Sequence, residues 1–189
     1  MQRKNKMATK NYTVAYRRKR ECKTDYRKRL KLLSSKKTRL VVRKTLNNVI
    51  VQFVNSKGQD HVVCGVTASK LRDFGWNYGL GNTPAAYLTG LLAGKIAKKK
   101  NISEAILDMG LQSKTSERLF AALKGVLDAE INVPHTKEIL PDESRIKGKH
   151  IAEYYEKVKK EGIPIQFSTY KPRLVENFEE VKNKILKQA

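Results

Sequence analysis

Apolar and polar residues alternate in three short runs between residues 39 and 67. The runs are Arg39–Arg43, Val49–Val54 and His61–Thr67, and turn-prone residues separate them at Asn47–Asn48 and Ser56–Gly58. Short turns between such runs predict an antiparallel meander of three strands.

The first run has different side chains on its two faces. Alternation places Leu40 and Val42 on one face, and Arg39, Val41 and Arg43 on the other. The first face is expected to join the core, and the second to present guanidinium groups beside apolar surface.

Helical spacing replaces alternation in the segment Asn82–Lys100. Thr83 is its candidate cap, Pro84 suits the first helical position, and a stripe of leucines follows. Gly90 and Gly94 cost helix propensity, so we expect them to permit close contact with the sheet.

One more strand and one more helix complete the core pattern. Ala105–Leu111 predicts the strand, and Ser116 is the candidate cap of a helix whose apolar positions run from Leu119 to Leu127. The order is βββαβα, and a strand joined through a helix to the next strand implies a parallel crossover. We therefore predict an α/β fold, with a mixed β-sheet covered by helices, over residues 36–130.

Residues 1–35 form a basic arm ahead of this core. Up to about Cys22 the arm lacks aliphatic periodicity, which predicts disorder in the absence of a binding target. Beyond it, a possible cap at Thr24 and apolar residues at helical spacing predict a short amphipathic helix, with one side against the body. The apolar residues are Tyr26, Leu30 and Leu33.

Residues 131–189 form a helical C-terminal extension. A proline-containing loop leads into one amphipathic helix that ends at Gly162, and a second helix follows Pro172. These helices are too short to hold a core of their own, so we expect them to clasp the main domain or a neighbour.

Charge is concentrated at the N-terminal end. The chain has 40 Lys and Arg against 18 Asp and Glu, and residues 1–44 hold 18 of these cations with two acids, or +16 of the net +22. A solvated tail or a nuclear localisation patch is the alternative for a basic run, but an excess of this size favours a polyanionic binding partner.

Tyr16 and Tyr26 stand among the cations, and aromatic rings stack on unpaired bases, so we predict binding to nucleic acid. RNA is favoured over DNA because no helix-turn-helix, zinc finger or basic zipper pattern is present.

The remaining motifs argue against other classes of function. Cys22 and Cys64 lack the spacing of a zinc or redox site and the density of a disulfide scaffold, so both are expected to be reduced thiols. The chain lacks a run of about 18 apolar residues and a signal peptide, which favours a cytoplasmic protein without membrane contact. A mitochondrial transit peptide is the alternative for the basic start, but the basic stretch runs beyond the usual cleavage sites.

No cofactor, metal site or catalytic residue is predicted. Alternation would place His61 and Cys64 on opposite faces of their strand, and the carboxylates of Asp108 and Asp128 are expected to be isolated. The GLGNTP loop at residues 79–84 lacks the lysine of a phosphate-binding loop and is interpreted as a turn with a helix cap. Trp76 and Tyr78, just before it, are interpreted as packing residues.

Several motifs spread over nearly the whole chain carry a family resemblance. They are Thr24–Leu33 (TDYRKRLKLL), Arg39–Lys44 (RLVVRK), Gly75–Trp76, Asn82–Ala97 (NTPAAYLTGLLAGKIA), Ala105–Leu111 (AILDMGL), Phe120–Glu130 (FAALKGVLDAE), Val133–His135 (VPH) and Gly148–Tyr155 (GKHIAEYY). With them the chain resembles the archaeal form of the universal 5S-RNA-binding protein of the large ribosomal subunit, the L-eighteen family, whose eukaryotic counterpart is L-five. Glu130 stands where the family usually has glycine, and glycine there would form a left-handed helix cap.

The resemblance implies a structural ribosomal protein that binds 5S rRNA and attaches it to 23S rRNA in the central protuberance, beside neighbouring large-subunit proteins. The candidate RNA-binding residues, from the arm and the first strand, are Arg3, Lys4, Lys6, Lys10, Tyr16, Arg17, Arg18, Lys19, Arg20, Lys23, Tyr26, Arg27, Lys28, Arg29, Lys31, Lys36, Lys37, Arg39 and Arg43. An RNA-processing or nucleotide-using enzyme is the alternative from another class, but it would need converging carboxylates and a divalent metal. A DNA-compacting protein is a third hypothesis.

Overall fold

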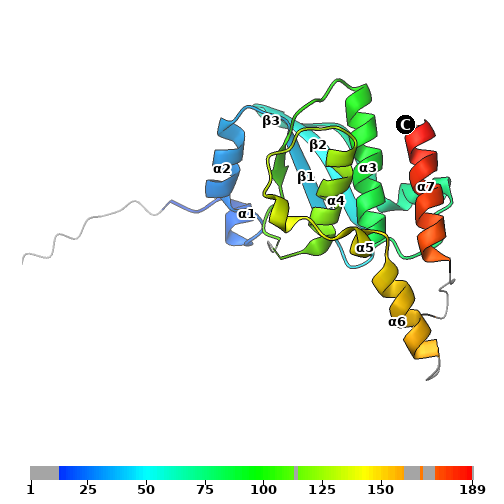
Figure 1. The fold of residues 1–189 in the computed structure, drawn as a ribbon. Coiled ribbons are helices and arrows are strands. Elements are labelled where there is room, and N and C mark those ends of the chain that lie inside the picture. The colour runs from blue at the N-terminus through cyan, green and yellow to red at the C-terminus, as the bar shows by residue number, and fades with distance from the viewer. Residues whose placement is uncertain (1–12, 113–114, 160–166, 168–172, 189) are drawn as a thin grey trace, which may run out of the picture.

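The computed structural model describes residues 13–112, 115–159, 167 and 173–188 (Figure 1). The strands are β1 (Arg39–Lys44), β2 (Val49–Lys57), β3 (Gln59–Thr67) and β4 (Ile106–Asp108). The helices are α1 (Arg17–Arg20), α2 (Tyr26–Ser34), α3 (Thr83–Lys99), α4 (Glu117–Asp128), α5 (Glu143–Ile146), α6 (Lys149–Lys159) and α7 (Leu174–Gln188), with 3-10 turns η1 (Ala68–Phe74) and η2 (Lys137–Ile139). The predicted order βββαβα is confirmed for the core.

The four strands form one mixed sheet in the order β3-β2-β1-β4. β1, β2 and β3 pair as an antiparallel meander, and β4 lies parallel to β1, with Arg39 opposite Ile106. The meander and the parallel crossover are therefore both confirmed. β4 is shorter than the predicted strand Ala105–Leu111, because the chain turns at Gly110, whose φ is +60° and whose amide donates to the Asp108 carboxylate.

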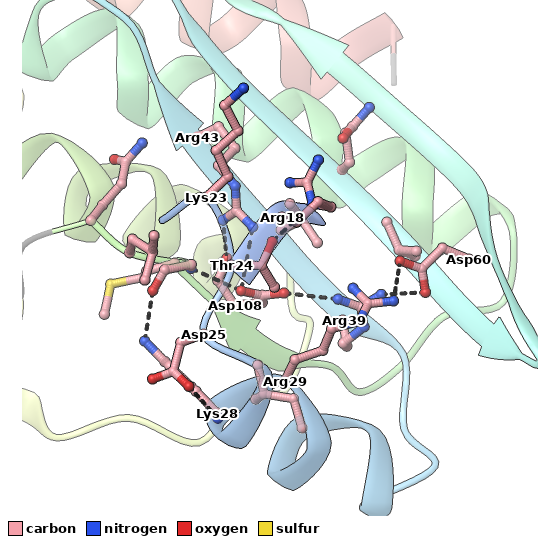
Figure 2. Close-up of a pocket in the computed structure, with 18 of the residues that line it drawn as sticks. Arg18, Lys23, Thr24, Asp25, Lys28, Arg29, Arg39, Arg43, Asp60 and Asp108 are labelled. Carbon is pink, nitrogen blue, oxygen red and sulfur yellow. Dashed lines mark hydrogen bonds and ion pairs between the residues drawn. The ribbon is translucent and has the colours of Figure 1, made fainter. Parts of the chain in front are cut away.

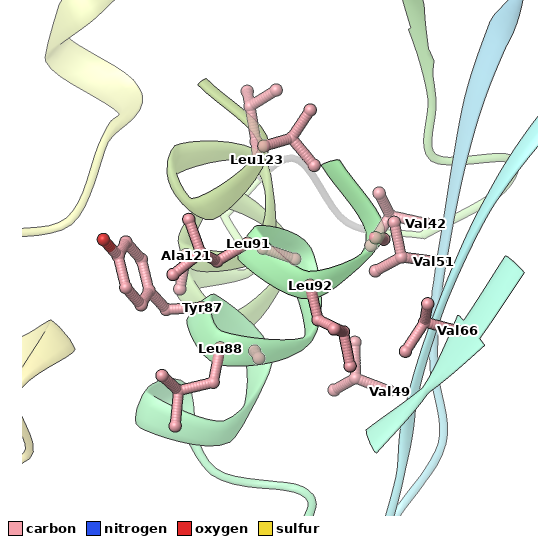
Figure 3. Close-up of a cluster of buried hydrophobic side chains, with 14 of the residues drawn as sticks. Val42, Val49, Val51, Val66, Tyr87, Leu88, Leu91, Leu92, Ala121 and Leu123 are labelled. Carbon is pink, nitrogen blue, oxygen red and sulfur yellow. The ribbon is translucent and has the colours of Figure 1, made fainter. Parts of the chain in front are cut away.

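One face of the sheet carries the main core. Leu40 and Val42 on β1 are fully buried there, as alternation predicted, and Phe53 on β2 lies beside them. Figure 3 shows the strand valines beside Leu92 of α3. Burial of side chains of this size contributes about 1.5–3 kcal/mol each, so this layer holds the sheet and α3 together.

The glycines of α3 permit close contact with α4, not with the sheet. A Cβ atom at Gly90 would lie 2.0 Å from the Ala122 carbonyl oxygen, and one at Gly94 would lie 2.5 Å from the Ala129 Cβ. Gly125 on α4 approaches the α3 backbone in the same way. The predicted contact with the sheet is thus wrong, because the neighbours of both glycines belong to α4 and the residue that follows it.

Two of the three helix caps are displaced by one residue from the predicted positions. Asp25, not Thr24, caps α2 by accepting from the amides of residues 27 and 28. Asn82, not Thr83, caps α3 by accepting from the Ala85 amide. Ser116 does stand at the start of α4, but its hydroxyl accepts from Lys44 and makes no capping bond.

The second residue after α4 has the left-handed backbone that the family's glycine predicted. Glu130 has a φ of +67°, and its side chain pairs with Lys98 of α3. The helix exit therefore keeps its shape without glycine, at the cost that a β-carbon carries in this conformation.

The last helix docks on the main domain. Leu174, Phe178, Val181 and Ile185 of α7 are fully buried, and the Phe178 ring lies 5.6 Å from that of Tyr87 on α3. Trp76 is buried in the same core, as predicted for a packing residue, and Tyr78 packs against it. α6 has no buried residue, so only the second of the two C-terminal helices holds the body firmly.

Candidate nucleic-acid interface

The basic arm lies over the face of the sheet that α3 and α4 leave uncovered. Between α1, α2 and this face is a cleft of about 790 Å³, which the loop 109–112 closes at one end (Figure 2). The sheet contributes outward-facing residues of β1, β2 and β3 to it, and the arm contributes residues from Arg18 to Leu32. The arm is thus placed beside the sheet, although simple periodicity predicted disorder up to Cys22; residues 1–12 lie outside the described residues.

An ion-pair network around the buried Arg39 forms one side of the cleft. The Arg39 guanidinium donates to Asp108 at 2.8 Å and to Asp60 at 2.7 Å, and only 4% of its side chain is exposed. The expected exposure of Arg39 is therefore wrong. The Asp108 carboxylate also accepts from Arg43 at 3.4 Å, so it pairs with two arginines.

Asp60 connects this network to the arm. Burial alone would raise the pKa of its carboxyl, but hydrogen bonds from Ser56, Arg29 and Arg39 outweigh burial and hold the pKa at about 2. Asp60 is consequently ionised at neutral pH. Its partner Arg29 belongs to α2, at 2.8 Å, so the carboxylate joins the sheet to the arm.

Helix α2 contacts the body through its cations as much as through its apolar residues. Lys28 donates to the Gly110 carbonyl oxygen at 3.0 Å, next to the Arg29–Asp60 pair. Leu30, which the pattern placed in the apolar stripe, is 69% exposed, while Tyr26 and Leu33 are half-buried. Part of the predicted inner side of this helix therefore faces outward.

The outward side of α1 and α2 is a basic face, formed by Arg17, Lys19, Arg20, Arg27 and Lys31. All five side chains are exposed, and among the described residues only Arg17 has an acidic partner, Glu21 at 3.7 Å. Tyr16 is exposed beside them, with its ring 5.1 Å from that of Tyr26. Cations without internal partners and an accessible aromatic ring are what contact with phosphates and bases requires.

The other candidate residues divide into three groups. Arg18 and Lys23 lie at the rim of the cleft. Arg18 donates to Thr24, and Lys23 pairs with Glu21 at 2.9 Å. Lys36 is exposed, whereas Lys37 pairs with Glu104. Arg3, Lys4, Lys6 and Lys10 lie outside the described residues.

The alternation argument about His61 and Cys64 does not hold. A register shift between Phe53 and Val54 interrupts the pairing of β2 with β3. Strict alternation would place Val62 and Cys64 on the same face of β3, but Val62 lines the cleft while Cys64 is buried in the core. Burial raises the pKa of the Cys64 thiol, which favours its neutral form. Throughout the described ranges, no three His, Cys, Asp or Glu side chains come together as a metal site would require.

The sequence pattern did not reveal that acidic and amide side chains belong to this interface. Asp60 and Asp108 organise the cations, and Gln52 lies on the floor of the cleft. The outward position of Gln52 on a predicted strand was the available signal, because a polar residue between Val51 and Phe53 must face away from the core.

Known proteins match the chain over both this interface and the rest of the fold. Residues 10–104 match the family described as "Ribosomal large subunit proteins 60S L5, and 50S L18". The large ribosomal subunit protein uL18 of Korarchaeum cryptofilum (strain OPF8) is 52% identical over 183 residues, covering 92% of this chain and 94% of that protein. The chain belongs to the uL18 family. The uL18 protein of Methanothermobacter thermautotrophicus (strain ATCC 29096) is 47% identical over 182 residues, covering 92% and 95%.

Membership of the uL18 family confirms the resemblance to the archaeal form of the L-eighteen proteins. It is a family of structural proteins of the large ribosomal subunit, so the predictions of a ribosomal location and of a role without enzymatic activity are confirmed. The family match includes α1, α2, the three-stranded meander and α3, and hence the whole basic face. In the part of the chain that the structure describes, no helix has the length and apolar character needed to cross a membrane.

Proposed function

We propose that this uL18-family chain binds 5S rRNA through the basic face of α1 and α2, and attaches it to 23S rRNA in the central protuberance. The observation that carries the proposal is the division of the arm's cations into two sets. Arg29 and Lys28 face inward and bind carboxylate and carbonyl oxygens of the body. Lys19, Arg20, Arg27 and Lys31 face outward with no acidic partner among the described residues.

This division gives the arm a fixed orientation toward its partner. Because the inward contacts hold α2 against the sheet, the outward cations form a preorganised surface, and less conformational entropy is lost on binding. The exposed Tyr16 ring adds a plane on which an unpaired base can stack. The C-terminal extension, on the other side of the body (Figure 1), is available for 23S rRNA and for neighbouring proteins.

The salt dependence of 5S rRNA binding tests the electrostatic part of the proposal. The logarithm of affinity should fall with the logarithm of salt concentration by about 0.7 to 0.9 per phosphate contact. Changing Lys19, Arg20, Arg27 and Lys31 together to Gln should lower this slope by up to about 3. A matched control changes four exposed lysines of α6 and α7 to Gln and should leave the slope for 5S rRNA unaltered; these are Lys149, Lys157, Lys159 and Lys187.

Equal effects of the two sets of changes would contradict the assignment to the arm. The identity of the RNA is tested separately, by sequencing the RNA that copurifies with the tagged full chain. A dominant 5S species is expected, and its absence would contradict the proposed partner whatever the slope.

A further inference from the structure

The floor of the cleft combines valine side chains with the amide of Gln52. Val41, Val54 and Val62 face the cleft from three adjacent strands, and Val62 is the exposed one, with 47% of its surface accessible. Gln52 lies among them, and its amide makes no hydrogen bond with any described residue. An amide in this position offers a donor and an acceptor to whatever covers the valines.

The residue beside Gln52 leaves room for such a group. Gly65 on β3 is paired with Gln52, and a Cβ atom there would lie 3.0 Å from the Gln52 Cγ. Any other residue would therefore crowd the glutamine side chain and raise the floor. Glycine keeps the amide accessible from the cleft.

The rim of the cleft favours an anionic group. Six cations line the cleft against three carboxylates. Two of the carboxylates, Asp60 and Asp108, are held by Arg39, and the third, Asp25, caps α2. The carboxylates are thus occupied by internal partners, whereas Arg18 at the rim binds the Thr24 hydroxyl and no acidic residue of the described ranges. An anion entering the cleft meets a net positive field.

The size of the cleft agrees with a small flat ligand carrying a negative charge. Its volume of about 790 Å³ falls in the range of roughly 300–1,000 Å³ that small ligands occupy. Tyr26 forms part of the arm side of the cleft, opposite the sheet. The apolar floor and the aromatic wall suit the base of a nucleotide. The amide suits the edge of that base, and the cationic rim suits the phosphate.

We propose that the cleft takes up one unpaired nucleotide of the bound rRNA, with its base on the valine floor, its edge read by Gln52 and its phosphate at the Arg18 rim. The inference rests on the proposed binding of 5S rRNA and assigns it a base-reading residue. The basic face then supplies affinity through phosphates, which carry no sequence information, and Gln52 supplies discrimination.

Gln52→Met tests the base contact, because it keeps the length of the side chain and removes the amide. Affinity for 5S rRNA should fall about tenfold, the effect of losing one or two hydrogen bonds. The salt slope should not change, since no cation is lost. Gln59→Met is the matched control: Gln59 is an exposed glutamine of the same sheet outside the cleft, and the change should have no effect.

Chemical probing of the RNA supplies the second readout. Dimethyl sulfate and carbodiimide together modify the Watson–Crick edges of all four unpaired bases. The wild-type chain should protect one unpaired base that Gln52→Met leaves reactive. Gly65→Val, which fills the space beside Gln52, should have the same effect, and thermal unfolding checks that each variant folds.

The outcomes separate this inference from the proposed function. If the wild-type chain binds 5S rRNA with a steep salt slope and Gln52→Met binds equally with unchanged protection, the nucleotide assignment is wrong and the basic face stands. If the wild-type chain shows no salt-dependent binding of 5S rRNA, the proposed function fails and the assignment fails with it.

Discussion

Arg39 lies on the outward face of the sheet and is nevertheless buried, because two carboxylates distant in sequence converge on it. Asp60 follows it by 21 residues and Asp108 by 69, and both accept hydrogen bonds from its guanidinium. A buried charge without a partner costs several kcal/mol, so each member of the network depends on the others. The network holds β1 to β4 and, through Asp60, the sheet to α2.

Asp108→Asn should lower the free energy of unfolding by about 3 kcal/mol, because it removes the more buried of the two carboxylates that pair with Arg39. The double change Arg39→Met with Asp108→Leu should recover most of this loss, since apolar side chains of similar size tolerate burial. Denaturant unfolding measures both. Lys124→Met, which breaks the half-exposed pair with Asp128, is the control and should cost less than about 1 kcal/mol.

A result in which Asp108→Asn costs no more than the control would mean that Asp60 and Ser56 alone compensate the Arg39 guanidinium. Sequence alone could not predict this network. Alternation correctly placed Arg39 on the face opposite Leu40, but a local pattern contains no information on residues 21 or 69 positions away. The caps at Asp25 and Asn82 were missed for a different reason: adjacent residues with similar capping ability compete, and backbone geometry decides between them.

The elements themselves could be predicted well, whereas their partners could not. Periodicity identifies which side of a helix is apolar, and the leucine side of α3 and the apolar side of α7 are buried as predicted. It does not say which neighbour covers each side. The glycines of α3 therefore predicted a close contact correctly and its partner wrongly, and the bulge in β3 was invisible because one extra residue leaves a strand-like composition unchanged.

Gly94→Leu should destabilise the protein by about 1–3 kcal/mol, because the new side chain would overlap Ala129 on α4 and force the helices apart. The loss should occur although leucine is the better helix former by nearly 1 kcal/mol. The control is Lys95→Leu, a change to leucine at the next position of the same helix. The lysine side chain there is half-buried. Thermal unfolding compares the two.

At temperatures where Gly94→Leu is folded, its affinity for 5S rRNA should equal that of the wild type. Lost RNA binding with unchanged stability would instead make α3 a contact surface.

At the scale of the whole molecule, the two faces of the sheet have separate roles. α3 and α4 cover one face and provide the core with α7, which packs against α3, and the basic arm covers the other face and points outward (Figure 1). The distribution of charged residues along the sequence predicted that the positive charge is concentrated in the arm and the first strand, because +16 of the net +22 lies in residues 1–44. The division into cations that hold the arm and cations that face outward required the structure.

The triple change of Arg17, Arg18 and Arg20 to Lys separates the geometry of these groups from their charge. If the arm acts as a generic polycation, affinity for 5S rRNA and its salt slope should be nearly unaltered. We expect affinity to fall while the slope changes little, because guanidinium planes fork onto phosphates and stack on unpaired bases, which ammonium groups do not. The Arg18 contact with Thr24 at the rim of the cleft depends on the same planar geometry.

Binding to a random RNA duplex of equal length is the control and should respond weakly, since a duplex offers few unstacked bases. Equal losses on both RNAs would show that the arm is non-specific, and discrimination would then have to come from the sheet face around Arg43 and Gln52.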